Sequence, residues 1–312
     1  MISIETNTAN IAAELGSFDL WITCASFEDR WHNAIDANIE KLAANEIYIF
    51  YVEEYEHYSK DKREFIKSKV TTHEFLLSLR SPIVSANNIR YSLDQAVKNN
   101  KRNIAIDIST FTREALLILL KFITTYETNF DRIDFIYITA HVNEKLSEGV
   151  VDTRSIIGYS GDISISKPLH LIIMSGFEIN RAKYIIENYE PDYISIGYGD
   201  KENSINEELR IKNEELSQNL KSSYPANQIF DFRFSLKNPS DTRHSIQEHL
   251  KYHEKLNANI VIAPLNNKIS TIGAGMAAID NENIQLCYSV PYKYNIEHYS
   301  TCHNTAYIIK YK

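Results

Sequence analysis

NIAIDISTFTREALLILLKF, residues 103–122, is the stretch that decides the fold. Residues 104–106 form a short apolar run, as a buried strand does, and residues 114–122 place Leu and Ile on most faces of a helix. The polar segment 107–113 separates the two. A buried strand that passes through a polar turn into a buried helix is the βα unit of an open parallel sheet. The stretch therefore predicts an α/β fold.

The polar turn is also the expected position of a ligand. Free backbone N–H groups and the positive end of the helix dipole face outward where such a strand ends and its helix begins. We expect Asp107, Ser109, Thr110 and Arg113 near that point, with hydroxyl groups donating to a phosphate and Arg113 neutralising its charge. The alternative is that one of the first three residues merely caps the helix, which is a common role for these residue types.

The spacing of this turn resembles the signature of the CARF family, which are Rossmann-like sensors of cyclic oligonucleotide messengers in CRISPR and related defence systems. That signature is Asp or Asn, any residue, Ser or Thr, three residues, then Arg or Lys, and Asp107, Ser109 and Arg113 fit it. The resemblance implies a Rossmann-like fold, a nucleotide ligand and a role in antiviral defence signalling.

Length and composition set the limits of the prediction. The chain has 312 residues, of which 44% are hydrophobic and 24% charged, so we expect a globular protein with a sizeable core. A net charge of −8 argues against extended nucleic acid or an anionic membrane as a partner. The three cysteines are far apart, and no stretch approaches the ~20 apolar residues of a membrane-spanning helix. We therefore predict a cytoplasmic protein.

Strands and helices alternate along the whole chain. In the first part we predict strands at 19–25, 46–52, 103–106 and 133–140 and helices at 31–44, 71–80, 86–99 and 114–122, with a charged, weakly periodic segment at 53–69. In the second part we predict strands at 169–174, 193–196, 259–263 and 284–290 and helices at 182–189, at 203–222, at 240–256 and before residue 278.

Similar motifs recur about halfway along the chain. Phe27 and Glu28 after the first strand correspond to Phe177 and Glu178, which lie 150 positions later. This spacing predicts two Rossmann-like halves with mostly parallel sheets, residues 1–165 and 166–312, that arose by internal duplication. The alternative is that α/β proteins simply repeat βαβ units. Two fused CARF-like units also resemble, in architecture, the SAVED family of cyclic-oligonucleotide sensors, which implies a ligand at the junction of the halves.

Each half carries an arginine just after its Phe-Glu pair. Arg30 and Arg181 are predicted to hold a phosphate through the planar guanidinium fork, and Phe27 and Phe177 to stack on a base. The alternative assigns Phe to the core and Glu to the first turn of the following helix.

PLNNKISTIGAG, residues 264–275, is the richest polar loop of the second half. We expect Lys268, Ser270 and Thr271 to bind an anionic group, because the small residues that follow let the backbone approach it. The alternative explains Gly273 and Gly275 by tight packing of a helix. This loop does not have the residue order of a Walker A motif, so hydrolysis by a P-loop is not predicted. The GxGxxG pattern is also missing, so a redox cofactor is not predicted.

The function predicted from these residues is that of a sensor of a nucleotide-type ligand that acts through a protein partner. The alternatives are an enzyme that cleaves a nucleotide, with unknown catalytic residues, and a non-catalytic accessory subunit. No cofactor or metal site is predicted, because the ten histidines are scattered and no paired-cysteine motif occurs. A homodimer is left open.

Overall fold

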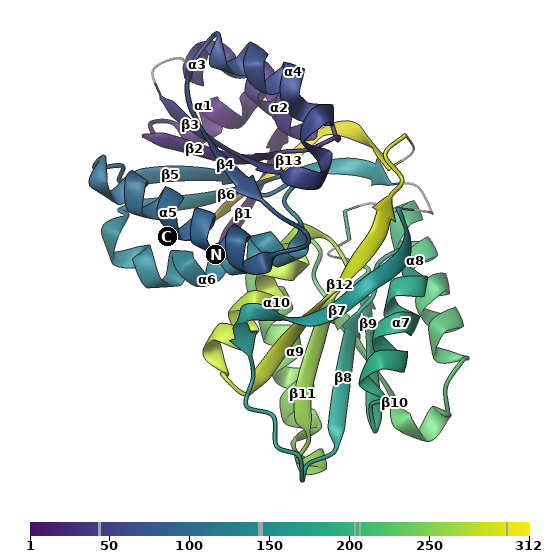
Figure 1. Cartoon of the computed structure of the whole chain (residues 1–312). Helices are drawn as coiled ribbons and strands as arrows, with labels where there is room; N and C mark the ends of the chain where they lie inside the picture. The colour runs from purple at the N-terminus through teal and green to yellow at the C-terminus, as the bar shows by residue number, and fades with distance from the viewer. Residues whose placement is uncertain (43–44, 143–145, 203, 206, 298) are drawn as a thin grey trace. The chain divides into compact units, whose positions relative to one another are not determined.

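The computed structural model describes residues 1–42, 45–142, 146–202, 204–205, 207–297 and 299–312. Its alternation of helices and mostly parallel strands confirms the predicted α/β class. The chain forms two compact units (Figure 1), of which unit 1 comprises Met1–Asn143 and Tyr299–Lys312, and unit 2 comprises Glu144–His298. This division differs from the predicted boundary at 165/166, because the segment before residue 166 joins the second unit and the end of the chain joins the first.

The described part of unit 1 contains a sheet of seven strands in the order β1-β13-β6-β5-β2-β3-β4. Strands β2 to β6 pair in parallel, whereas β13 pairs antiparallel with β6 and β1 pairs antiparallel with β13. The central strands are nearly continuous apolar runs because helices cover both faces of the sheet. The strands are β1 (Ile2–Asn7), β2 (Leu20–Ala25), β3 (Glu46–Val52), β4 (Thr71–Leu77), β5 (Asn103–Asp107), β6 (Arg132–Val142) and β13 (Ser300–Lys310).

The helices of unit 1 lie on both faces of this sheet, as Figure 1 shows. One face carries α1 (Ile11–Leu15), α2 (Arg30–Asp36), α3 (Ile39–Leu42) and α4 (Glu56–Lys67), and the other carries α5 (Pro82–Lys98) and α6 (Arg113–Tyr126). Trp21 and Trp31 are fully buried in the core of the first face. Most residues of α6 are buried, as its all-round apolar sequence predicts.

Unit 2 has a six-stranded sheet across its described residues, in the order β10-β9-β8-β11-β12-β7. Helices α7 and α8 cover one face and α9 and α10 the other (Figure 1). The strands are β7 (Ser147–Ser160), β8 (Leu169–Met174), β9 (Tyr193–Gly199), β10 (Ile229–Phe234), β11 (Asn259–Pro264) and β12 (Ile284–Tyr294). The helices are α7 (Ile179–Tyr189), α8 (Glu207–Lys221), α9 (Pro239–Tyr252) and α10 (Lys268–Asp280).

The two units share one topology. The parallel strands follow the order β4-β3-β2-β5-β6 in unit 1 and β10-β9-β8-β11-β12 in unit 2, so that the first parallel strand of each unit, β2 or β8, lies in the middle of the series and the strand order reverses once. An antiparallel strand completes the sheet beside β6 and beside β12. This identity of strand order supports the predicted pair of similar halves.

The completing strands are exchanged between the units. Strand β7 follows β6 in the chain but pairs with β12, and β13 follows β12 but pairs with β6. Each half of the sequence therefore supplies the antiparallel strand that pairs with the last parallel strand of the other half's sheet.

Several predicted elements were wrong or incomplete. The segment predicted as a helix at 71–80 contains strand β4. Its side chains alternate between more and less exposed positions, and Phe75 and Leu77 are buried. Because β4 lies at the edge of the sheet, its first residues are open to solvent. The segment 53–69, which showed little apolar periodicity, forms α4 because Arg63 and Ile66 are buried together on one side. The helix predicted at 31–44 is two helices, α2 and α3, and its last two positions lie outside the described residues.

Besides β4, four strands were not predicted, namely β1, β7, β10 and β13. All four are at or next to a sheet edge, where exposed polar residues interrupt the apolar pattern. The helix predicted at 203–222 begins at Glu207, and positions 203 and 206 are outside the described residues.

Candidate ligand-binding sites

Asp107 is the centre of a buried hydrogen-bond network rather than an exposed ligand. Its side chain is fully buried, and Oδ1 accepts hydrogen bonds from the Ser109 backbone N–H at 3.0 Å and from Ser109 Oγ at 2.5 Å. Oδ2 accepts a hydrogen bond from Thr23 Oγ1 of β2 at 3.1 Å. Burial raises the pKa of the Asp107 carboxyl, and these hydrogen bonds oppose the rise. Asp107 thus fastens the turn after β5 to the neighbouring strand.

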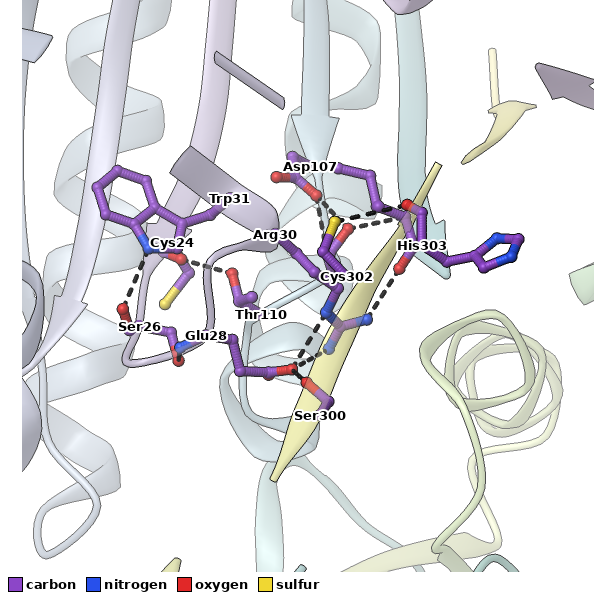
Figure 2. Close-up of polar contacts among 12 residues, drawn as sticks. Cys24, Ser26, Glu28, Arg30, Trp31, Asp107, Thr110, Ser300, Cys302 and His303 are labelled. Carbon is purple, nitrogen blue, oxygen red and sulfur yellow. Dashed lines mark hydrogen bonds and ion pairs between the residues drawn. The ribbon is translucent and has the colours of Figure 1, made fainter. Parts of the chain in front are cut away.

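Ser109 and Thr110 extend the same network. Ser109 Oγ accepts a hydrogen bond from the Ile138 N–H of β6 at 2.8 Å, and Thr110 Oγ1 donates to the Cys24 carbonyl of β2 at 2.5 Å. The contact between Thr110 and Cys24 is visible in Figure 2. The N-cap of α6 is Thr112, which accepts from the Ala115 N–H at 3.2 Å, so none of the three residues predicted as candidates caps the helix.

Replacing Asp107 by alanine is expected to destabilise unit 1. The substitution leaves the buried N–H of Ser109 and the hydroxyl of Thr23 without their acceptor, and each orphaned donor costs about 1–3 kcal/mol. Denaturant unfolding of unit 1, followed by hydrogen exchange in its core strands, measures the loss. The control is Asp61→Ala on the exposed side of α4, where little change is expected. Equal stability of the two variants would contradict the structural role of Asp107.

Arg113 and Phe27 lie at the same end of the unit 1 sheet. Arg113 is the first residue of α6, is half-buried, and lies within electrostatic range of Tyr137, as Arg30 does. Phe27 is half-buried, and its ring meets those of Tyr55 and Tyr299 edge-on at centroid distances of 5.6 and 5.3 Å. The predicted stacking face of Phe27 is thus engaged with aromatic side chains of unit 1.

Arg30 forms a buried ion pair with Glu28. Its Nε and Nη2 donate to Glu28 Oε2 at 3.1 and 2.7 Å, and its Nη1 donates to the Ile138 carbonyl at 2.8 Å. Ser300 Oγ, at the start of β13, donates to the same carboxylate, as Figure 2 shows. Burial lowers the pKa of the Arg30 guanidinium, but the adjacent charge of Glu28 outweighs it and raises the pKa on balance. Every guanidinium nitrogen therefore has a protein partner.

Unit 2 repeats this arrangement around Arg181. Arg181 Nη1 donates to Glu178 Oε2 at 2.7 Å, and Nη2 donates to the Ser289 carbonyl. Ser147 Oγ, at the start of β7, donates to Glu178 Oε1 at 2.5 Å.

The two ion pairs match position by position. Arg30 and Arg181 are 151 positions apart, and so are the carbonyl acceptors of Ile138 and Ser289. In each unit the serine comes from the exchanged strand. The Glu-x-(x)-Arg motif thus has a structural basis in both units, and this geometry does not support the predicted role of Arg30 and Arg181 in holding a phosphate.

The polar loop before α10 also binds mainly to itself. Ser270 Oγ and Thr271 Oγ1 donate to the Asn267 carbonyl at 3.0 and 2.9 Å, and both residues are fully buried. Asn267 is the N-cap of α10 and accepts from the Ser270 N–H. The predicted anion contacts of Ser270 and Thr271 are therefore not supported. Lys268, the first residue of α10, is half-buried.

Packing explains Gly273 of α10, as the alternative interpretation held for this residue. A Cβ atom on Gly273 would lie 2.5 Å from the Thr242 Cβ and 2.8 Å from the Pro239 carbonyl oxygen, both of α9. Only glycine lets α9 and α10 approach this closely.

A surface cavity of about 560 Å³ lies elsewhere in unit 2, where β8 ends. The segment after β8 contributes Phe177 and Glu178, and the start of β7 contributes Ser147. The helices contribute polar and aromatic side chains, which are Asn180, Arg181 and Tyr184 from α7 and Lys212, Glu215 and Asn219 from α8. Lys212 is half-buried on its helix. Of the residues predicted to bind a ligand, the cavity brings together Phe177 and Arg181 only.

Lys212 was not predicted as a site residue, because α8 has the alternating charges of a solvated helix. One signal existed, since Lys212 lies 150 positions after Lys62 of α4. Lys62 forms an ion pair with Asp29, beside Phe27 in unit 1. The internal repeat therefore pointed to a lysine that faces the segment after the first strand of each unit.

The described residues contain neither a metal-binding cluster nor a membrane-spanning helix. No group of three or more His, Cys, Asp or Glu side chains there is arranged to hold a metal ion. None of the helices in the same ranges combines the length and the apolar character needed to cross a membrane.

The sequence matches no protein-family model and no curated protein. Among solved structures it is similar to a periplasmic ribose ABC transporter from Conexibacter woesei, with 14% identity over 85% of this chain and 69% of that one and a TM-score of 0.26. It is also similar to a universal stress protein from Archaeoglobus fulgidus, with 10% identity over 89% and 97% of the two chains and a TM-score of 0.27. A cyclopropane-fatty-acyl-phospholipid synthase-like protein from Lactobacillus casei has 8% identity over 97% and 88% and a TM-score of 0.29. Similarities this distant carry no argument about function.

Proposed function

We propose that unit 2 binds a small nucleotide-type ligand in the cavity where β8 ends. The observation that carries the proposal is the position of this cavity at the carboxyl end of β8, the first parallel strand of a doubly wound sheet. Ligands of such sheets bind outside the carboxyl ends of the strands. A volume of about 560 Å³ lies within the range of about 300–1,000 Å³ that is usual for small-molecule sites.

The lining of the cavity has the chemistry that a nucleotide needs. Phe177 and Tyr184 offer aromatic faces for a base, as aromatic side chains do in many nucleotide sites. Lys212 supplies positive charge for a phosphate, and the amide groups of Asn180 and Asn219 supply donors and acceptors for a sugar or base edge.

The biological role proposed here rests on the CARF-like turn and the tandem architecture alone. We propose that the ligand belongs to the cyclic oligonucleotides and that the chain acts in the cytoplasm as a sensor in antiviral defence, signalling through a protein partner. Asp107, Ser109 and Thr110 then serve the fold of unit 1, and the ligand is recognised by unit 2.

Ligand binding is tested by thermal unfolding with a panel of mononucleotides and cyclic di- and oligonucleotides. A ligand at 100 times its Kd is expected to stabilise the native state by about 2.7 kcal/mol. Lys212→Ala removes a charge-assisted hydrogen bond and should weaken binding by roughly 10- to 100-fold. The matched control is Lys183→Ala on α7, another half-buried lysine of unit 2 that does not line the cavity.

Three outcomes are distinguishable. A ligand that loses affinity in Lys212→Ala but not in Lys183→Ala supports the cavity as its site. Equal affinity in both variants places the ligand elsewhere, and no response to any nucleotide contradicts the proposed function. Chromatography of the same mixtures shows whether the ligand is also cleaved, which would identify an enzyme instead of a sensor.

A further inference from the structure

Three histidines and a serine form a buried cluster at the opposite end of the unit 2 sheet, where β8 and β9 begin. The Nε2 atoms of His170 and His249 lie 2.6 and 2.7 Å from Ser195 Oγ, which is fully buried. His253 follows α9, and its ring centroid is 4.6 Å from that of His249 and 5.8 Å from that of His170. His170 and His249 are only 1% and 8% exposed.

The geometry at Ser195 determines which of the two Nε2 atoms carries a proton donor and which is an acceptor, one of each. A serine hydroxyl has one proton to donate, so with two imidazole nitrogens in reach it donates to one ring and accepts from the other. The ring that accepts at Nε2 is therefore the neutral Nδ1–H tautomer, and the other ring carries a proton on Nε2. Burial disfavours a second proton on that ring, so we expect both rings to be neutral and of opposite tautomers. If the accepting ring gained a proton on Nε2, both rings would direct an N–H group at Ser195 Oγ. The hydroxyl proton of Ser195 would then lose its acceptor.

The surroundings offer little compensation for a positive charge. Phe232 of β10 stacks on His249 at 4.7 Å, and Phe230 of the same strand lies 4.1 Å from the ring of His253. The negative charge of Asp231 in β10 would stabilise a protonated His249. However, Asp231 forms an ion pair with Lys221 and is largely exposed.

The other elements around the cluster contribute few charges. Tyr193 of β9 is the neighbouring titratable group, with its ring 6.4 Å from that of His170. A cavity of about 260 Å³ beside His170 and His253 is bordered by Asp162, Lys167, Glu254 and, from β11, Asn259. Asp280 of α10 is held by Arg243 and Gln247 of α9.

We propose that this cluster is an acid-sensitive switch, in which protonation of His170 and His249 opens the packing of α9 on β9 and β10 in unit 2. The opening follows because two cations that repel each other cannot remain in one apolar pocket. The proposal is independent of the ligand cavity at the other end of the sheet.

The direction of the pH dependence follows from burial. Burial, followed by the charges of the other two histidines, lowers the pKa of His170 to about 3, and burial lowers the pKa of His249 to about 4. The ordinary value of about 6.5 applies in the open state. Stability is therefore fully present above pH ~6.5 and is lost as the pH falls from there towards ~4, because the open state binds protons that the closed state does not. The opening constant should rise up to about tenfold per pH unit for each histidine, or about 100-fold for the pair.

Hydrogen exchange of the full chain between pH 7.5 and 5, corrected for the intrinsic exchange rate, measures this opening in the α9 and β10 amides. We expect the opening constant to rise steeply below pH 6.5 in the wild type. His249→Gln keeps a hydrogen-bonding group at the position of Nε2 and should reduce the rise to about tenfold per pH unit. His244→Gln, on the exposed side of the same helix, should behave as the wild type.

The proposal is overturned if the opening constant of the wild type is the same at pH 7.5 and 5, or if His249→Gln keeps the full slope. Because His249→Gln could fail to fold, NMR of the wild-type imidazole nitrogens at pH 6 gives a second test. Two neutral rings with opposite tautomers are expected for His170 and His249, and a charged ring at either position would refute the proposal.

Discussion

Deletion of residues 300–312 is expected to unfold unit 1 and leave unit 2 intact. Strand β13 lies between β6 and β1, and its residues Ala306, Tyr307, Ile308 and Ile309 are at most 4% exposed. Burial of one large apolar side chain contributes about 1.5–3 kcal/mol, so the loss of the three large ones approaches the whole stability of about 5–15 kcal/mol of a typical domain. Strand β1, whose pairing partner is β13, would be lost with it.

Hydrogen exchange resolved by peptide measures the result, with the strands of unit 2 as the internal control. Protection should disappear from β2, β5 and β6 and persist in β8, β11 and β12. Two point variants of β13 provide a matched comparison. Ile308→Asp places a charge in the core, whereas Asn304→Asp places a charge at an exposed position of the same strand. Retention of a protected β6 in the deleted chain would show that β13 is not required by unit 1.

Arg30→Met is expected to destabilise unit 1 by about 3–5 kcal/mol, which is the usual cost of breaking a buried ion pair by removing one partner. The carboxylate of Glu28 would stay buried and would keep the hydrogen bond from Ser300 Oγ, but it would lose the guanidinium that neutralises its charge. The double variant Glu28→Gln/Arg30→Met should recover much of this loss, because no unpaired charge remains. Denaturant unfolding of unit 1, monitored through its two buried tryptophans, Trp21 and Trp31, provides the measurement.

The matched control for Arg30→Met is Arg102→Met. Arg102 also forms an ion pair at 2.7 Å in unit 1, with Asp131, but its side chain is 49% exposed and that of Asp131 is 61% exposed. Pairs in solvent contribute little to stability, so no measurable change is expected. If the two methionine variants were equally stable, burial of the Glu28 and Arg30 pair would have no energetic consequence.

The sequence predicted the parallel core of both units well, because its strands are short apolar runs that end in polar turns. It failed at the sheet edges. Strand β4 has polar residues at its exposed start, and β13 begins with STCHNT, so neither shows the continuous apolar pattern of a central strand. The exchange of β7 and β13 could not be predicted at all, because pairing between strands leaves no local signal in either strand.

The candidate sites were predicted from residue types, and this is where the prediction was weakest. Asp107, Ser109 and Thr110 have side chains that suit a phosphate, but the same oxygens suit the backbone groups that a tight turn leaves unpaired. The residues of the unit 2 cavity come from β7, α7 and α8, which are far apart in sequence. Only Phe177 and Arg181 were predicted there, because the repeated motif placed both next to the end of β8.

The exchanged strands also determine the order in which a ribosome can complete the two units. Multidomain chains usually fold from the N-terminus as they are synthesised. In this chain the strands of unit 2 have all been synthesised once β12 is complete, whereas the sheet of unit 1 still lacks β13. Unit 1 is therefore the first to be started and the last to be closed during translation, and the apolar edge of β6 must stay protected until the final residues of β13 leave the exit tunnel.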